Sequence, residues 1–578
     1  MPPHPDSSPP TPNREETTMS RPIRLLAAAV GLALVLAGCS SIPRSGPVQV
    51  GQDAVTGENP APVFLPFGPR AGATMEEILA GFIDAATSPD NNYEIAREFL
   101  TPSFSTAWKS DTGVTVDDGS GRTFAALNES TMQFSVRPVA EVNAIGEYHE
   151  ETPSASLPLR YEFMQVDGEW RISVAPNGTV LDQTTFKDVF SAQSLYFFDP
   201  DYRYLVPDVR WYPRGASTPT KIVNGVLSGP SEWLAGAVTS AFPEGTALTA
   251  DAVTVVARDA KVDLNSEALN ADRITLQRMK SQLENSLPSG LTVSITINQN
   301  SQDIDALGAA EPVVNPRVDA RALVLRDGEF GFLAATGKTV NPLPGLSEAI
   351  AALSPTSVTL SPSQTAAAAL TAQGVYGIRV GDEARMLDPR QGLIAPSIDG
   401  SGYVWSVPAD RPNELFAYNT QGAALAVPTP WQDAATIAAL KVSRDGTRVI
   451  ALLSAGGETR LVVAAVLREN GAPVGLGDPV QLAVGTGTPV DATWIDQSTV
   501  AYLSVQADGE DRMVSHEIGG TSVRLESSTG IKTITGSNLL RDLRALSTDG
   551  SLLVQRGVGW QERIDGVTLV ATQQGIGG

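Results

Sequence analysis

The residue with the clearest chemistry is Cys39, the only cysteine in the 578 residues of the chain. Its thiol can take a diacylglycerol through a thioether bond. The small residues just before it suit a peptidase that cuts between Gly38 and Cys39. A short apolar run, 25–36, precedes them, and Arg21 and Arg24 stand in front of that run. This order of a positive region, an apolar region, small residues and a cysteine is that of a bacterial lipoprotein signal.

We therefore expect Cys39 to be the first residue of the mature protein, carrying an S-diacylglycerol and an N-acyl chain such as palmitate. About twelve apolar residues are too few for a transmembrane helix of roughly 20 residues. Two or more acyl chains anchor a protein stably, so the expected location is the extracytoplasmic face of the cell membrane. The alternative interpretation is a buried structural cysteine after a core helix. Met19 begins a conventional signal better than Met1 does, and the sequence leaves both starts open.

Other constellations that could do chemistry are few. His4 falls in the expected signal segment, and neither His149 nor His516 has a second metal ligand three or four residues further on. A zinc site is therefore not expected. The members of a Ser/His/Asp triad need only meet in space, but the Gly-x-Ser-x-Gly elbow of many hydrolases is absent from the sequence. We predict no catalytic residues, no cofactor and no metal.

Acidic residues dominate the charge of the chain, which is −23 in total. Segment 1–38 holds three basic and three acidic residues, so its removal leaves this value unchanged. Nucleic acid binding rests on Lys and Arg that neutralise phosphates, and the acidic balance argues against it. Asp117-Asp118 and the group Glu147, Glu150 and Glu151 could bind calcium, but EF-hand spacing is absent and a solvated acidic loop is the simpler interpretation.

The elements that would position any site begin after a Pro-rich tether, 39–73, which buries little. Thr74 and Glu77 form a capping-box pair at the start of a helix. Helices followed by an antiparallel meander predict an α+β domain over 74–189, in an order similar to the cone-shaped nuclear-transport-factor-2-like fold. Such a cone can carry a lipid or small ligand, although aromatic residues filling an ordinary core is the simpler interpretation. The residues concerned are Phe82, Phe104, Tyr161 and Phe163.

A second α+β domain is expected over 190–305. It combines strands with two helices, one with Pro219 in its first turn and an end at Ser228-Gly229-Pro230. Four stretches resemble the GerMN domain of spore-germination and cell-envelope proteins, namely 195–198, 205–207, 226–230 and 253–264. The resemblance implies a non-catalytic binding module outside the cytoplasm.

After a linker, 306–316, short apolar runs alternate with turns over 317–578. The pattern Ser-x-Asp-Gly starts at Ser397, Ser443 and Ser547, and weaker copies start at Leu325, Ser361 and Trp494. In such a tight turn Asp caps its own backbone and Gly supplies the positive φ. The intervals, about 36 to 53 residues, suit four strands each, the size of a propeller blade. We predict an all-β propeller of about six blades, with seven blades and a generic sandwich as alternatives.

The whole order, from lipoprotein signal through tether and two α+β domains to a propeller, resembles the LpqB family of actinobacterial lipoproteins. The resemblance implies a membrane-anchored, non-enzymatic binding or adaptor protein of the cell envelope. It also implies a partner, the extracytoplasmic domain of the Mtr two-component sensor histidine kinase, and through it effects on cell division and envelope homeostasis. The alternative is a cell-wall glycan-binding or hydrolytic propeller protein, with acids and bases around its funnel.

Overall fold

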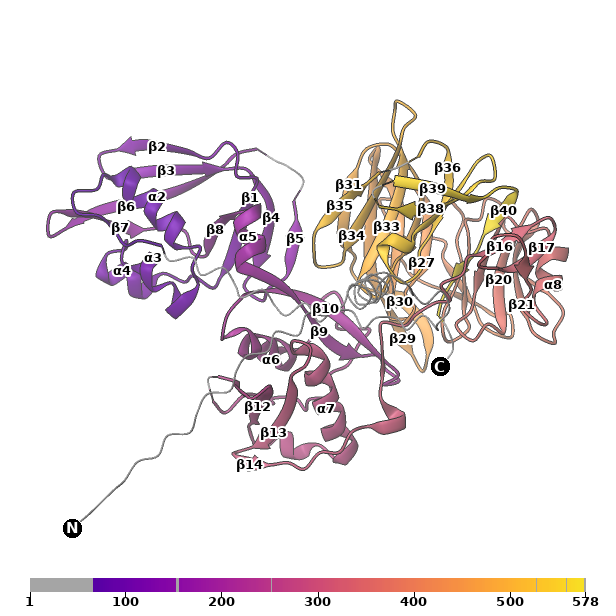
Figure 1. Ribbon diagram of the computed structural model, residues 1–578, viewed down its shortest axis with the longest axis horizontal. Coiled ribbons are helices and arrows are strands. Elements are labelled where there is room, and N and C mark those ends of the chain that lie inside the picture. Colours follow the sequence, from indigo (N-terminus) through magenta and orange to yellow (C-terminus); the bar gives the residue numbers. More distant parts are fainter. Residues whose placement is uncertain (1–65, 152–154, 251, 527, 558, 576–578) are drawn as a thin grey trace, which may run out of the picture. The chain divides into compact units, whose positions relative to one another are not determined.

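The computed structural model describes residues 66–151, 155–250, 252–526, 528–557 and 559–575. All of them belong to one compact unit. Gly38 and Cys39, the expected cleavage and lipidation residues, lie outside these ranges. Inside them, no helix is both long enough and apolar enough to cross a membrane. Figure 1 shows helices mixed with strands in the first part of the described chain and strands almost throughout the rest.

Two four-stranded sheets and several short helices build the first domain, with the orders β2-β3-β6-β7 and β5-β4-β1-β8. The predicted capping box is present: the Thr74 hydroxyl accepts a hydrogen bond from the Glu77 amide, and the Glu77 carboxylate accepts one from the Thr74 amide. The elements are α2 (Met75–Ala85), η1 (Asp90–Asn92), α3 (Glu94–Arg97), α4 (Pro102–Ala107), β1 (Gly113–Asp117), β2 (Thr123–Asn128), β3 (Thr131–Val136), β4 (Pro138–Asn143), β5 (Tyr148–Glu150), β6 (Leu157–Val166), β7 (Glu169–Val174) and β8 (Thr179–Asp182).

The second domain contains the sheets β15-β10-β9 and β11-β12-β13-β14. Its core joins Ile222 of α6 and Leu283 of α7 to Phe197 of β9. The short strand β15, in the stretch 306–316, pairs in parallel with β10 and so adds to this domain's sheet. Helix α5 (Gln183–Val189) belongs to the first domain, where Phe186 packs in one cluster with Val116 of β1. The elements of the second domain are β9 (Phe190–Phe198), β10 (Tyr204–Pro213), α6 (Thr218–Ser228), β11 (Thr254–Val256), β12 (Asp259–Leu264), η2 (Ser266–Asn270), α7 (Arg273–Ser286), β13 (Thr292–Ile297), β14 (Asn300–Ser301), η3 (Gly308–Ala310) and β15 (Val313–Val314).

Six sheets follow in the described residues, and we number them as blades in chain order. Blade 1 is β18-β17-β16-β40, blade 2 is β22-β21-β20-β19-β41, and blade 3 is β23-β24-β25-β26. Blade 4 is β27-β28-β29-β30 with β31 beside β29, blade 5 is β32-β33-β34-β35, and blade 6 is β36-β37-β38-β39. The predicted fold class, a mixed α/β region followed by an all-β propeller of about six blades, is confirmed.

The elements of blades 1 to 3 are β16 (Leu323–Arg326), β17 (Glu329–Leu333), β18 (Val340–Asn341), α8 (Ser347–Ala352), β19 (Ser357–Leu360), β20 (Ala366–Thr371), β21 (Gly374–Arg379), β22 (Arg385–Asp388), β23 (Ser397–Ile398), β24 (Val404–Ser406), β25 (Phe416–Tyr418) and β26 (Ala424–Ala426). Those of blades 4 to 6 and the C-terminal strands are β27 (Thr436–Val442), β28 (Arg448–Ala455), β29 (Glu458–Glu469), β30 (Ala472–Leu476), β31 (Val480–Gly485), β32 (Thr488–Trp494), β33 (Thr499–Val505), β34 (Asp511–Glu517), β35 (Ser522–Leu525), β36 (Ile531–Thr535), η4 (Leu540–Asp542), β37 (Arg544–Ser547), β38 (Leu552–Arg556), β39 (Gly559–Ile564), β40 (Val567–Val570) and β41 (Thr572–Gln573). The sequence analysis did not predict α8, because six residues with one buried large apolar side chain, Ile350, show no helical periodicity.

The ring of blades is closed by the end of the chain. Strand β40 pairs antiparallel with β16, through Leu569 opposite Leu325 and Val570 opposite Val324. Leu569 is buried in the core between blades 1 and 2, whereas Val570 is buried in the core between blades 6 and 1. One strand therefore holds three blades together.

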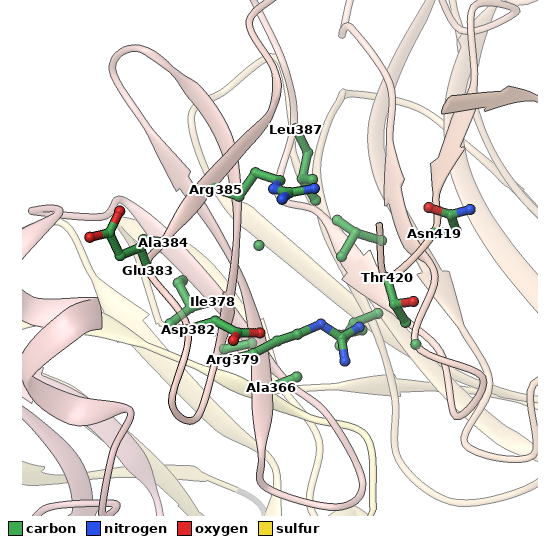
Figure 2. A pocket seen from close by; sticks show the side chains of 15 residues that line it. Ala366, Ile378, Arg379, Asp382, Glu383, Ala384, Arg385, Leu387, Asn419 and Thr420 are labelled. Atoms are coloured by element: carbon green, nitrogen blue, oxygen red, sulfur yellow. The ribbon is translucent and has the colours of Figure 1, made fainter. Parts of the chain in front are cut away.

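The seam between blades 2 and 3 is thinly packed. Its core contains six buried apolar residues, whereas the core between blades 3 and 4 contains sixteen. The buried residues that β20 contributes to the thin core are the small Ala366 and Ala368, with Leu370 partly buried beside them. Figure 2 shows the side chains that border the open space left at this seam.

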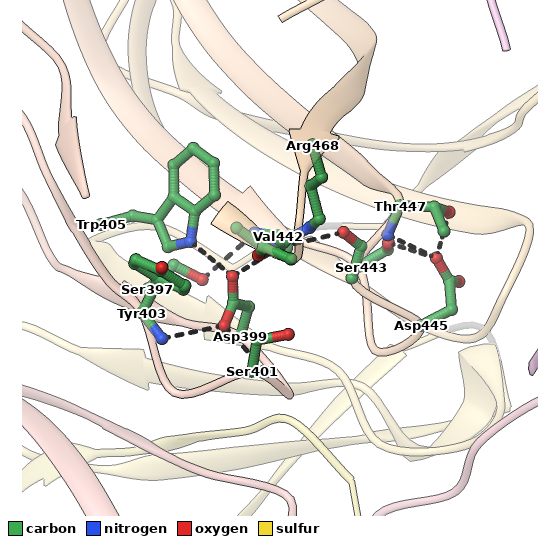
Figure 3. Close-up of polar contacts among 12 residues, drawn as sticks. Ser397, Asp399, Ser401, Tyr403, Trp405, Val442, Ser443, Asp445, Thr447 and Arg468 are labelled. Atoms are coloured by element: carbon green, nitrogen blue, oxygen red, sulfur yellow. Dashed lines mark hydrogen bonds and ion pairs between the residues drawn. The ribbon is translucent and has the colours of Figure 1, made fainter. Parts of the chain in front are cut away.

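The predicted Ser-x-Asp-Gly turns are present at the blade edges. In blade 4, Asp445 Oδ1 accepts hydrogen bonds from the Ser443 hydroxyl at 2.8 Å and the Thr447 amide at 3.0 Å (Figure 3). Gly446 then takes a φ of 77°, as the pattern requires. In blade 3 the positive φ falls on Gly402 instead of the expected Gly400, because the turn there closes two residues later, from Asp399 to Gly402.

The frame of the repeat also shifts between blades. In blades 3 to 5 the turn joins the first and second strands of its sheet, counted from β23, β27 and β32. In blade 2 the turn joins β19 and β20, and β41 lies on the other side of β19. In blade 1 the closing strand β40 takes the first place, so the turn joins the second and third strands. The turn of blade 6 likewise joins β37 and β38, the second and third strands.

Leu569→Ala tests the ring closure. The side chain is 2% exposed, and removing a buried Leu side chain costs about 2–5 kcal/mol because a cavity remains. We expect the free energy of unfolding to fall by this amount in urea titrations followed by tryptophan fluorescence. The control is Thr568→Ala, on the exposed side of the same strand, which should change it by less than about 0.5 kcal/mol. Equal effects of the two substitutions would contradict the closure.

A second prediction concerns the buried pair of Asp445 and Arg448, whose Oδ2 and Nη2 atoms are 2.6 Å apart. Asp445→Ala leaves a buried guanidinium without its carboxylate, and we expect a loss of about 3–5 kcal/mol in the free energy of unfolding. The double variant Asp445→Ala/Arg448→Met should be more stable than Asp445→Ala alone. Asp478, exposed and without a side-chain contact in the described structure, provides the control Asp478→Ala. A double variant less stable than the single one would contradict this account.

Candidate functional site

The thin seam between blades 2 and 3 contains a cavity of about 440 Å³, within the usual range for small-molecule sites. We call it the seam cavity. Its floor is apolar, with Ala366 and Ile378 from blade 2 and Ile398 and Val404 from blade 3. Its rim is polar and comes from two turns, 380–384 between β21 and β22 and 419–423 between β25 and β26. The cavity therefore combines an apolar base with charged groups at its edge.

Two arginines of blade 2 border the seam cavity and reach across to glycine turns of blade 3. Arg379 Nη2 lies 3.3 Å from the position that a Cβ would take at Gly402. Arg385 donates a hydrogen bond through Nη1 to the Gln421 carbonyl and lies beside Gly422. Figure 2 shows the two guanidinium groups on different sides of the open space. A Cβ at either glycine would make a tight contact with the arginine, which would have to move by a few tenths of an ångström.

Neither guanidinium has a carboxylate within ion-pair distance in the described part of the chain. The carboxylates of Asp382 and Glu383 line the same cavity but make no ion pair with these arginines. Asn419 Oδ1 accepts hydrogen bonds from its own turn, from the Gln421 and Ala423 amides, which leaves its Nδ2 group as a donor. The rim thus offers several donors and two acidic acceptors to a ligand.

A third arginine at this seam is fully engaged. Arg390 pairs with Asp388 at 2.7 Å, and its guanidinium lies 4.6 Å from the Phe416 ring centre. Burial alone would raise the pKa of Asp388, but hydrogen bonds from Arg390 and Ser406 lower it below its usual value. Because the Ser406 hydroxyl donates to the same carboxylate at 2.7 Å, this group links blade 2 to blade 3.

Three more buried aspartates are also held by arginine. Asp117 pairs with Arg122 at 2.7 Å and Asp208 with Arg210 at 2.8 Å. Asp399 pairs with Arg468 at 2.5 Å and also accepts from Trp405 Nε1, as Figure 3 shows. These aspartates, together with Asp388 and Asp445, have side chains that are at most 3% exposed. Their role is therefore to fix neighbouring elements.

The candidate metal residues of the sequence have other partners. Asp118, beside the paired Asp117, lies 3.4 Å from Arg137 Nε, and the Glu147 carboxylate accepts from Asn143 Nδ2 at 2.6 Å. Glu150 accepts from the Ser522 hydroxyl at 2.8 Å. Among the residues that the structure describes, no group of three or more His, Cys, Asp or Glu side chains is arranged to hold a metal ion.

The two histidines of the domains differ in their surroundings. His149 is about half exposed on β5, whereas His516 on β34 is buried. Burial lowers the pKa of His516 to about 4, so its imidazole is neutral at neutral pH. Its Nδ1 atom lies 3.6 Å from a carboxylate oxygen of Glu150, and the neutral ring makes this a contact of two domains and not an ion pair.

The aromatic residues expected at the cone of the first domain pack against one another. Phe82, Tyr161 and Phe163 are at most 5% exposed, and Phe104 packs against the same cluster. The ring centres of Phe82 and Trp108 are 5.2 Å apart. These side chains form a packed core, which leaves the carrier interpretation without support from them.

Sequence reasoning did not identify Arg379 and Arg385. Arg379 is the last residue of β21 and Arg385 is the first residue of β22. Neither belongs to a motif, and charged residues next to a turn are common. The only signal in the sequence was indirect: the two glycines, Gly402 and Gly422, mark turns. In the structure their φ angles are 84° and 82°. Only the packing of blade 2 against blade 3 places the arginines over those glycines.

Comparison with known proteins follows the same division of the chain. Residues 68–187 match the family "Lipoprotein LpqB, N-terminal domain". Residues 194–303 match "Sporulation and spore germination", and residues 331–569 match "Lipoprotein LpqB beta-propeller domain". The GerMN-like and propeller assignments made from sequence are confirmed.

Curated relatives extend over nearly the whole chain. Lipoprotein LpqB of Streptomyces coelicolor is 26% identical over 95% of this chain and 98% of its own length. Lipoprotein LpqB of Cutibacterium acnes is 25% identical over 93% of this chain and 97% of its own length. Among solved structures, TolB from Acinetobacter baumannii is similar to 43% of this chain, over 65% of its own length, with a TM-score of 0.30 and 15% identity. A lipid anchor in the membrane is what the relatives' name implies, and the chain belongs to the LpqB family of lipoproteins.

Proposed function

We propose that this protein is a lipid-anchored adaptor on the extracytoplasmic face of the cell membrane that binds the extracytoplasmic domain of a sensor histidine kinase and modulates its signalling. Two-component control of cell division and envelope homeostasis is the process concerned. The anchor is Cys39, acylated after cleavage between Gly38 and Cys39. The three domains provide the binding surfaces.

The observation that carries the proposal is the use of the buried carboxylates. Acid–base or nucleophilic catalysis needs an accessible carboxylate or histidine aimed at a substrate. The five aspartates paired with arginine are instead buried and bind neighbouring strands and turns. Because these buried charged residues hold the domains rigid instead of facing a substrate, the molecule is better suited to binding than to catalysis.

The hydrolytic alternative would place its chemistry in the propeller funnel. In blade 4, Arg444 is 6% exposed and donates hydrogen bonds to the carbonyl oxygens of Pro316 and Ile495, at 3.0 Å each, and of Ser537. Burial lowers the pKa of Arg444 to about 10, so the group stays charged at neutral pH. This arginine joins the stretch before the propeller to blades 4, 5 and 6, which supports a structural role for the residues around it.

The lipid would act through proximity. A short tether holds the domains near the membrane. Their effective concentration around another membrane protein is therefore higher than that of a protein free in solution. Weak individual contacts then suffice for a stable association. The net charge of −23 argues against docking on anionic lipids by charge.

Photocrosslinking in intact cells tests the partner. A benzophenone side chain is introduced in the full-length protein at one exposed apolar position per domain, where it disturbs no core. The positions are Ile145, Val256 and Val523, which are 52%, 53% and 53% exposed. We expect ultraviolet light to link at least one of them to a sensor histidine kinase, identified by mass spectrometry.

Two controls accompany the crosslinking. Cells kept in the dark give no product, and a Cys39→Ala form of the productive variant gives much less, since the anchor supplies the local concentration. If none of the three positions gives a crosslink to a sensor kinase, or if the crosslinked proteins are only glycan-processing enzymes, the adaptor proposal is wrong.

Cys39→Ala tests the anchor itself. Without the thiol the diacylglycerol has no acceptor, so the precursor should keep the segment before residue 39 and carry no fatty acid. Mass spectrometry of the purified protein and metabolic labelling with a palmitate analogue measure both properties. Ser41→Ala, two residues further on, is the matched control and should be processed like the natural chain. Normal acylation of Cys39→Ala would refute the assignment.

A further inference from the structure

We propose that the seam cavity between blades 2 and 3 binds the carboxylate end of a short peptide with small side chains. The proposed adaptor function does not require this site, and either can fail without the other. Four features of the cavity support this ligand: the arginines at its rim, the carboxylates on the same rim, its apolar floor and the lack of aromatic side chains in its lining.

The carboxylate would be received by Arg379 and Arg385. A guanidinium presents several N–H donors in a planar fork that matches the two oxygens of a carboxylate. In the described chain the Arg379 side chain has no hydrogen-bond partner, and Arg385 uses only Nη1, on the Gln421 carbonyl. Both groups therefore keep N–H donors for a ligand. The nearby Arg390, in contrast, donates its Nε and Nη2 hydrogens to Asp388.

Both arginines lie against blade 3 without a ligand, and Arg385 is also held there by the Gln421 carbonyl. Arg379 rests against Gly402 and Arg385 against Gly422, and both turns belong to blade 3. Such preorganisation lowers the entropy that binding would otherwise cost. The lining also carries the carboxylates of Asp382 and Glu383, so the two guanidiniums can receive an anionic group while the two carboxylates receive hydrogen-bond donors of the same ligand.

The remaining polar groups suit a peptide backbone. Asp382 and Glu383 can accept hydrogen bonds from amide N–H groups or from a terminal ammonium. Asn419 and Thr420 face the cavity from blade 3, as Figure 2 shows. Their amide and hydroxyl groups can bind a peptide carbonyl. A ligand with a carboxylate at one end and N–H groups along its length satisfies both kinds of rim charge.

The floor selects for small apolar side chains over sugar rings. Ala366, Ile378 and Val404 offer a smooth aliphatic surface. Sugars in proteins commonly stack their rings on aromatic side chains, and the residues lining this cavity, all within the described chain, include none. A volume of about 440 Å³ accommodates a few small residues and excludes a folded domain.

Calorimetric titration of the full mature protein tests the site with tri-alanine as the probe. We expect saturable binding, and about tenfold weaker binding for tri-alanine amide, which lacks the carboxylate. Arg379→Gln and Arg385→Gln should each weaken tri-alanine binding by about tenfold or more. Arg379→Lys should restore only part of the loss, because an ammonium lacks the planar fork.

Arg524→Gln removes the same charge from an exposed position on β35 in blade 5 and should leave the affinity unchanged. Circular dichroism and thermal melting show that the variants keep the fold. Absence of saturable binding up to millimolar tri-alanine, or affinity that is equal in Arg379→Gln and the natural chain, would overturn the proposal. Binding of N-acetylmuramic acid without binding of tri-alanine would also overturn it, since the carboxylate would then come from a sugar. Failure of this site would leave the crosslinking result untouched.

Discussion

The pairing of β40 with β16 is the contact on which the propeller depends, because it joins the end of the chain to the first blade. The single cysteine rules out an internal disulfide as an alternative clasp. Closure therefore rests on ladder hydrogen bonds and on the burial of Leu569 and Val570 in two different seams. Since each seam needs both of its blades, loss of one strand weakens three blades together, and the ring unfolds as a unit.

Aspartate–arginine pairs set the second constraint, which is orientation. A buried ion pair adds little net stability, because desolvation offsets the attraction. Its directional hydrogen bonds nevertheless fix one element against another. Asp399 accepts from Trp405 in its own blade and from Arg468 in the next, and Asp388 accepts from Ser406 across the seam. Charged groups thus help to hold the angles between neighbouring blades, both at the thin seam between blades 2 and 3 and at the well-packed seam between blades 3 and 4.

Much of the fold could be predicted from the sequence, because it depends on local patterns. The capping box at Thr74, the turn at Asp445 and the repeat of blade-sized intervals all require only neighbours in the chain. The sequence could not reveal ring closure by β40, since pairing across more than 200 residues leaves no local signal. The same holds for the seam cavity, where Arg379 and Gly402 meet only after two blades pack. The lipidation of Cys39 stays a prediction from its motif.

The composition of the seam between blades 2 and 3 is hard to explain by stability alone. Larger side chains at Ala366 and Ala368 would bury more apolar surface, at about 0.8 kcal/mol for each added CH₂ group. A carboxylate opposite Arg379 would also neutralise a charge that now faces open space. Sequences tend to depart from such local optima at functional sites. Because the seams on either side of blade 3 differ so much in their cores, the fold itself does not demand a thin seam. A ligand that fills the seam cavity and neutralises the guanidiniums of Arg379 and Arg385 therefore explains both features together.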